Sequence, residues 1–105
     1  MYAKTGQKLR QIREQRKLSL RKVAGLLNID IAILSKMERG ERRLTKEVIE
    51  KLANVYEYNC AELLVLYLSE KVVNEIGEEE LAIKAIQLAE EQIICEKQLN
   101  KLNLK

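Results

Sequence analysis

Residues 19–40 read SLRKVAGLLNIDIAILSKMERG, the most informative segment of the sequence for the fold. It holds two short apolar patterns of helical spacing, each preceded by a residue suited to start a helix. Ser19 and Asp30 are strong N-cap residues, because their side-chain oxygens accept a backbone N–H from the first helical turn. Asn28, between the two patterns, tolerates a left-handed backbone better than most residues other than glycine. The stretch therefore predicts two short helices joined by a sharp turn.

Further helical patterns lie on either side of this unit. Thr45 can cap one helix, and Asn59 with Glu62 three residues later forms a capping-box-like start for another. The helices are expected over about 5–17, 20–27, 31–39, 46–56 and 60–76, with Gly40 and Gly77 as two of their ends. The inward positions are Leu9, Ile12, Val23, Ala24, Leu27, Val48, Ile49, Leu52, Ala53, Tyr56, Leu63, Leu64 and Tyr67, with the stem of Arg16 closing the first stripe.

The tail, residues 78–102, is expected to form one long helix opened by three glutamates, which suit the positive end of a helix dipole. Its apolar residues recur four and three apart, the spacing of a helix that pairs with another helix. We interpret this helix as a dimerisation segment with residues 1–69 as one domain and 70–105 as the other. The residues expected to mediate dimerisation are Leu81, Ala85, Leu88, Ile86, Ile93, Cys95 and Leu99.

Composition supports an all-α protein and excludes several chemistries. The 105 residues are 47% apolar and 33% charged, and they include no proline. Histidine is absent, and Cys60 and Cys95 stand far apart, so we expect no metal site, no cofactor and no enzyme activity. Both cysteines lie in apolar patterns, which indicates small buried side chains in a reducing cytoplasm. No apolar run is long enough to cross a membrane, and no small-molecule sensor domain is visible.

The net charge of +3 conceals an uneven distribution. Residues 1–43 carry twelve Lys and Arg against four Asp and Glu, a net of +8, whereas residues 44–105 carry a net of −5. Such a division is typical of a chain in which one part binds a polyanion. Charge alone does not separate nucleic acid from an acidic protein partner.

Beyond the pattern of helices, the identities of many residues make the sequence resemble the Cro/phage-repressor type (XRE-like) of helix-turn-helix domain. The resemblance covers about residues 5–66, and its most specific part is the run from Ser35 to Gly40 at the right distance from Ser19. Leu20 stands where this family usually has glutamine, which removes one expected DNA contact, and Asn28 stands where it usually has glycine. The other matching residues are Gly6, Leu9, Arg10, Ile12, Arg13, Leu18, Val23, Ala24, Leu27, Ile29, Leu34, Leu52, Ala53, Leu63 and Leu64.

The resemblance implies a five-helix domain that places its third helix, residues 31–39, in the major groove of double-stranded DNA. It implies an ion pair between Arg13 and Glu38 that fixes this helix against the first one. The positions that would face bases are Ile31, Ala32 and Lys36, and those that would contact phosphate are Arg21, Lys22, Arg39, Arg42 and Arg43.

The leading hypothesis is thus a sequence-specific transcriptional regulator, a repressor that acts as a homodimer. A DNA-binding antitoxin or a restriction–modification controller would use the same domain. The alternative hypothesis is that the chain is a protein-interaction adaptor that has lost DNA binding. It is supported by Leu20 and the apolar run 31–33, which could form an exposed patch for a protein partner. The lysine and arginines around that patch favour DNA.

Overall fold

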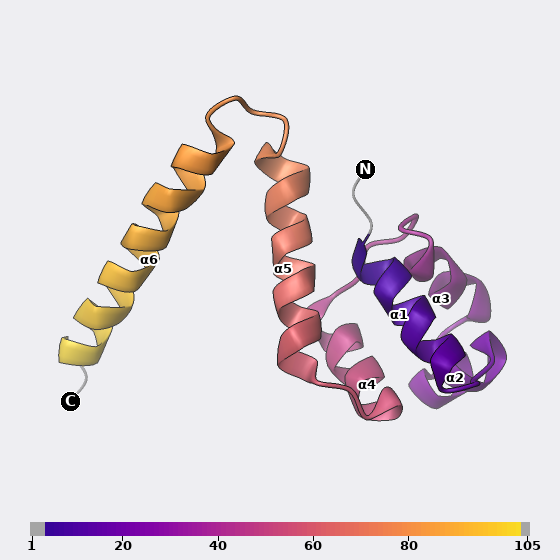
Figure 1. The fold of residues 1–105 in the computed structure, drawn as a ribbon. Helices are drawn as coiled ribbons and strands as arrows, with labels where there is room; N and C mark the ends of the chain where they lie inside the picture. The colour runs from indigo at the N-terminus through magenta and orange to yellow at the C-terminus, as the bar shows by residue number, and fades with distance from the viewer. Residues whose placement is uncertain (1–3, 104–105) are drawn as a thin grey trace. The chain divides into compact units, whose positions relative to one another are not determined.

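The computed structural model describes residues 4–103, which form six α-helices and no strand (Figure 1). The all-helical class, with an N-terminal helix-turn-helix and a long C-terminal helix, agrees with the prediction from the sequence. The chain divides into two compact units, Met1–Glu75 and Ile76–Lys105. The helices are α1 (Lys4–Gln15), α2 (Leu20–Leu27), α3 (Ile31–Glu38), α4 (Lys46–Tyr56), α5 (Cys60–Ile76) and α6 (Ala82–Asn103).

The first unit has one hydrophobic core, to which each of its five helices contributes. All the predicted inward residues except Val48 and Leu64 are buried, and those two are partly buried against the core. Arg16 is a correction, because its side chain is exposed and its Nε donates to the backbone oxygen of Tyr56 at 2.9 Å. It therefore satisfies a free carbonyl at the end of α4 instead of completing the buried face of α1.

Polar side chains cap the helix starts as the sequence predicts. Each of the four capping oxygens accepts one backbone N–H that the helix itself leaves without a partner. The pairs are Ser19 Oγ with Lys22 N at 3.0 Å, Asp30 Oδ1 with Ala32 N at 2.8 Å, Thr45 Oγ1 with Val48 N at 3.2 Å and Asn59 Oδ1 with Glu62 N at 3.0 Å.

The first four helices all end in a left-handed residue, and only one of these residues is glycine. The positions are Lys17, Asn28, Gly40 and Glu57, with φ between 52° and 78°. After each one, the next backbone N–H donates to the carbonyl five residues earlier, as in the Schellman motif. Three of these following residues are apolar and pack against the core, which offsets the strain of a left-handed side-chain-bearing residue. They are Leu18, Ile29 and Tyr58.

Helix α5 is continuous across the expected domain boundary between residues 69 and 70. Leu63 and Tyr67 hold its first half in the core, and Gly77 follows its last residue as predicted. A stripe on its solvent side remains uncovered within the described chain. This stripe comprises Val65, Leu68 and Val72, which are 66%, 49% and 41% exposed.

Helix α6 begins four residues later than the sequence predicts. Residues 77–81 form turns, closed by hydrogen bonds from Glu79 N to the Ile76 oxygen and from Ala82 N to the Glu79 oxygen. The glutamates therefore belong to the connection between two helices, and Leu81 precedes the helix. Cys60 is partly buried against the core, and Cys95, which is also expected in the dimer seam, is exposed in the single chain. No helix within residues 4–103 is both long and apolar enough to span a membrane.

Candidate nucleic-acid interface

Helix α3 has one buried face and one open face. Leu34 and Met37 lie in the core, which fixes the orientation of the helix. The turn before α3 starts at Asn28, whose left-handed backbone directs the chain from α2 into α3. The open face carries the three residues that were expected from the sequence to face bases, and all three are exposed: Ile31, Ala32 and Lys36.

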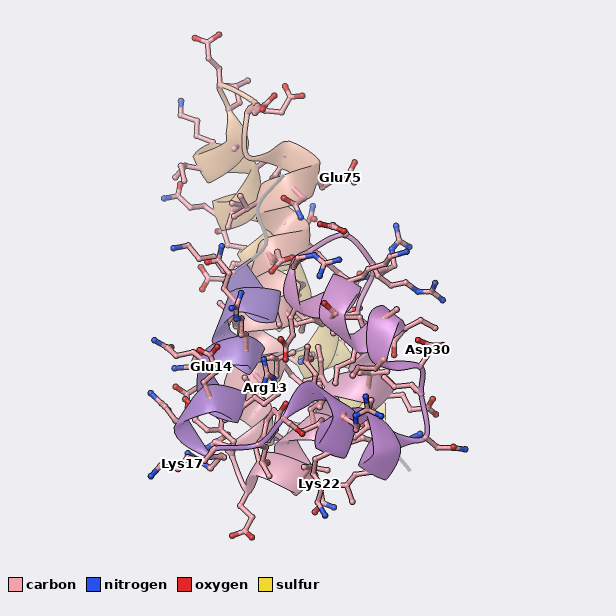
Figure 2. All side chains as sticks on the ribbon, turned by 90° about the vertical axis from the view of Figure 1, so that its right-hand side faces the viewer. Arg13, Glu14, Lys17, Lys22, Asp30 and Glu75 are labelled. Atoms are coloured by element: carbon pink, nitrogen blue, oxygen red, sulfur yellow. The ribbon has the colours of Figure 1, made fainter. Side chains whose placement is uncertain are left out.

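Five basic residues surround this open face in sequence, and all are exposed. Arg21 and Lys22 lie in the first turn of α2, where free backbone N–H groups and the helix dipole also favour an anion. Arg39 follows the last residue of α3, and Arg42 and Arg43 lie in the connection to α4. Figure 2 shows Lys22 at the surface of the first unit, whereas Arg13 points into it. The surface thus combines an exposed helix face with cations at both ends of the helix-turn-helix.

A buried ion pair joins α1 to the end of α3. Arg13 donates from Nε and NH2 to the two carboxylate oxygens of Glu38 at 2.8 and 3.1 Å, and from NH1 to the Leu18 oxygen at 2.9 Å. The residues are only 9% and 5% exposed. The hydrogen bond to Glu38 raises the pKa of the Arg13 guanidinium. Because a bidentate pair fixes both distance and angle, it holds α3 in one orientation on α1.

Gly6 allows α1 to approach the same end of α3. A Cβ atom at this position would lie 2.5 Å from the Met37 carbonyl oxygen and 2.7 Å from that of Glu38. Both atoms are backbone, so no side-chain rotation could relieve the clash. Gly6 and the Arg13–Glu38 pair therefore act on one contact, between α1 and the C-terminal end of α3.

Tyr56, the last residue of α4, lies near this ion pair. Its side chain is 1% exposed, and its hydroxyl has no hydrogen-bond partner within residues 4–103. Burial raises the pKa of this hydroxyl well above its usual value, and the negative charge of Glu38 adds to the effect. Tyr56 is therefore neutral and acts as a packing residue near the pair.

Arg39 is already engaged by neighbouring side chains. Its Nε and NH2 groups donate to the two carboxylate oxygens of Glu41 at 3.0 and 3.2 Å, and its NH1 group donates to Ser35 Oγ. The hydrogen bonds between Arg39 and Glu41 raise the pKa of Arg39 and lower that of Glu41. Arg42 and Arg43 differ, because neither forms an ion pair or a side-chain hydrogen bond within the described residues.

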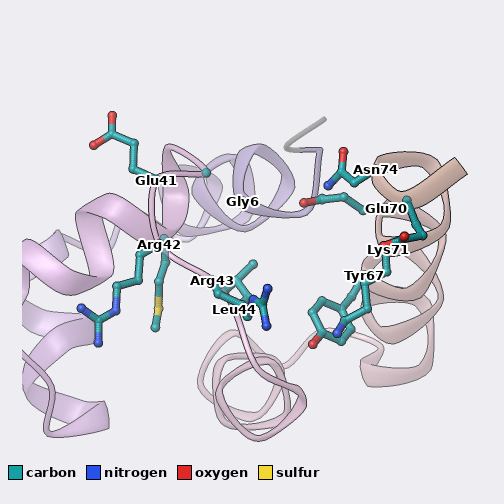
Figure 3. Close-up of a pocket in the computed structure, with 12 residues that line it drawn as sticks. Gly6, Glu41, Arg42, Arg43, Leu44, Tyr67, Glu70, Lys71 and Asn74 are labelled. Carbon is teal, nitrogen blue, oxygen red and sulfur yellow. The ribbon is translucent and has the colours of Figure 1, made fainter. Parts of the chain in front are cut away.

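A cleft of about 410 Å³ separates the connection at residues 40–44 from the second half of α5 (Figure 3). Leu44 and Tyr67 line its apolar part, and the ammonium group of Lys71 lies 5.1 Å from the centre of the Tyr67 ring. Glu70, also in the lining, accepts the backbone N–H of Thr5 at 2.7 Å and so caps α1. The cleft therefore adjoins the basic connection. One of its charged residues, Glu70, is engaged in joining α5 to α1.

The sequence indicated the exposed face of α3 and its basic neighbours but missed the engagement of Arg39. The i, i+2 spacing of Arg39 and Glu41 predicts no contact in a helix, and the contact depends on the reversal at Gly40. The Glu70–Thr5 contact was also missed, because the two residues are 65 positions apart. No local signal could have suggested it.

Three comparisons with known proteins bear on this surface. The helix-turn-helix family profile matches residues 9–63, about half of the chain. The HTH-type transcriptional regulator DdrOP3 of Deinococcus deserti is 34% identical over 58 residues, which cover 55% of this chain and 45% of that protein. The chain thus aligns with less than half the length of this relative. No solved structure matches the chain.

Proposed function

The chain belongs to the helix-turn-helix family, and we propose that it is a sequence-specific DNA-binding transcriptional regulator, a repressor that acts as a homodimer. The observation that carries the proposal is the environment of α3. One face of this helix is fixed by the core and by the buried Arg13–Glu38 pair, and the other is exposed between clusters of cations. A rigid helix with free side chains and flanking positive charge fits the major groove of DNA.

The open face of α3 suggests how bases would be read. Ile31 and Ala32 offer only apolar contact, which suits the C5-methyl group of thymine, and Lys36 can donate to O6 or N7 of guanine. Specificity would rest on one lysine–guanine contact in a T-rich neighbourhood, together with DNA shape. Affinity would come mostly from the arginines and lysine around the helix, by contact with phosphates.

The homodimer is proposed to form through α6. Ile86, Leu88, Ile93 and Leu99 are 40%, 55%, 54% and 53% exposed in the single chain, an unusual load of apolar surface for one helix. Pairing two copies of α6 would cover the stripe that Leu88 and Leu99 share, whereas Ile86 and Ile93 lie on a second stripe beside it. The two copies of α3 would then need to lie about 34 Å apart in order to enter successive major grooves on one face of the DNA.

Selection of bound fragments from sheared genomic DNA tests this function directly. We expect enriched fragments to share an inverted repeat with T-rich half-sites about 10 base pairs apart, centre to centre. Recovery of fragments with no common sequence would mean that the protein binds DNA without reading it. Recovery of no DNA at low salt would refute the proposal.

The adaptor hypothesis retains one favourable observation, which is that Ile31 is 42% exposed. The rest of the expected apolar patch is weaker than the sequence suggested, because Leu20 and Ile33 pack partly against the core. An antitoxin or a restriction–modification controller would bind DNA by the same surface, so these alternatives concern the biological role and not the chemistry of the site.

A further inference from the structure

Three of the five N–H donors on Arg39 are engaged before any DNA is present. Two of its nitrogens bind both oxygens of Glu41, and the third binds the hydroxyl of Ser35 on the preceding turn of α3. Ser35 and Arg39 are four residues apart, so they lie on the same side of the helix. The guanidinium is thereby held alongside the open face of α3 with a carboxylate on its outer donors.

A carboxylate and a phosphate bind a guanidinium in the same way. Each presents two acceptor oxygens to the parallel N–H groups of an arginine, so both bind by the same fork-to-fork geometry. Arg39 cannot donate from Nε and NH2 to a DNA phosphate while it donates from them to Glu41. The two contacts are mutually exclusive on this edge of the guanidinium.

We infer that Glu41 is an internal competitor for the phosphate-binding site of Arg39, and that it limits the affinity of this protein for every DNA sequence. This inference rests on the proposed DNA-binding function and adds a residue that opposes binding. Glu41 acts in two ways. It must be displaced before Arg39 contacts phosphate, and once displaced it leaves a negative charge close to the DNA backbone.

The position of Glu41 makes this competition reversible. The Arg39 and Glu41 side chains are 47% and 57% exposed, and exposed ion pairs are weak because water competes for both partners. Glu41 is also fixed by its backbone, because its N–H donates to the Lys36 oxygen at 2.8 Å. A change of its side chain therefore removes the competitor without altering the turn after α3.

The test is Glu41→Gln in the full chain, with DNA affinity measured by fluorescence anisotropy at several salt concentrations. We expect binding about twofold to fivefold tighter, on preferred and non-preferred sequences alike, given the strength of exposed pairs. The slope of log affinity against log salt concentration should become steeper by up to about 0.9, which is the contribution of one phosphate contact. Unchanged affinity would overturn the inference while leaving the proposed function intact.

Two further variants separate competition from a general charge effect. Glu14→Gln changes the net charge equally and breaks a comparably exposed Arg–Glu pair, Arg10–Glu14, within α1. It should leave affinity within twofold of the original protein. In an Arg39→Ala background, Glu41→Gln should give a clearly smaller gain, because the competed group is gone and only the repulsion between the Glu41 charge and the DNA backbone is removed. An equal gain with and without Arg39 would show long-range repulsion and overturn the inference, and absence of DNA binding by every variant would refute the proposed function as well.

Discussion

Arg13 and Glu38 fix the C-terminal end of α3 against α1. The pair is bidentate and nearly buried, and Arg13 uses a third donor on the Leu18 oxygen. Removing one partner leaves the other charged, buried and without its counter-ion. The cost of a single substitution is therefore much larger than the net contribution of the intact pair.

We predict that Arg13→Ala and Glu38→Ala each lower the free energy of unfolding by about 3 kcal/mol. The double variant should lose less than the sum of the two, because it leaves no isolated charge. Urea denaturation of the four proteins gives these values. Strict additivity would show that the two residues contribute independently.

Gly6 and Gly25 offer a matched pair of substitutions. Gly6→Ala places a methyl group against two backbone oxygens, so we expect a loss of about 1–3 kcal/mol in unfolding free energy. At Gly25, within α2, an added methyl group would meet no atom within 4 Å outside its own helix. Gly25→Ala should therefore stabilise by about 0.5–1 kcal/mol through helix propensity. Thermal melts compare the two, and equal effects would mean that α1 and α3 are not in close contact.

At the scale of elements, the helix-turn-helix could be predicted because its signals are local. Ser19, Asp30 and Thr45 each cap a helix through hydrogen bonds that span two or three residues. The turn at Asn28 follows from the tolerance of one residue for left-handed geometry. Buried positions followed from apolar spacing alone. In each case, the physical cause lies within one turn of the residue concerned.

Other elements could not be predicted because their causes are not local. The start of α6 was placed at residue 78, although the connection from α5 needs its own turn residues and delays the helix to Ala82. The exposure of Cys95 depends on which surface, if any, packs against α6, and the sequence of the helix does not identify that surface. The contacts of Arg39 and Glu70 depend on where folding brings their partners.

The connection from α3 to α4 allows a test of phosphate binding. Arg43 is exposed and forms no ion pair within residues 4–103, so its charge is free for DNA. We predict that Arg43→Ala weakens binding to all sequences about equally and flattens the salt dependence by about 0.9. Lys51→Ala, which removes an exposed charge from α4, serves as the control. An equal loss for both variants would indicate a general charge effect.

At the scale of the whole molecule, the proposed dimer can be tested without truncation. Leu88 and Leu99 lie on the same face of α6, because eleven residues make about three helical turns. We predict that Leu88→Glu with Leu99→Glu converts a dimer into a monomer in light scattering, and that DNA binding weakens accordingly. Gln87→Glu, on the side of α6 away from both apolar stripes, should leave the dimer intact. A dimer that survived the double substitution would place the interface elsewhere, with the exposed stripe of α5 as the next surface to test.

The proposed function requires that α3 read base pairs, and DNA-site selection with Lys36→Ala shows whether it does. Selection from a random library, by the original protein and by the variant, gives the preference at every position of the site. We predict that the variant loses its preference at one guanine–cytosine pair in each half-site and keeps the others. Lys22→Ala, a phosphate-contact variant, should lower recovery without changing the selected sequence. An identical selected sequence for Lys36→Ala and the original protein would contradict base recognition by Lys36 and, with it, the proposed role of α3.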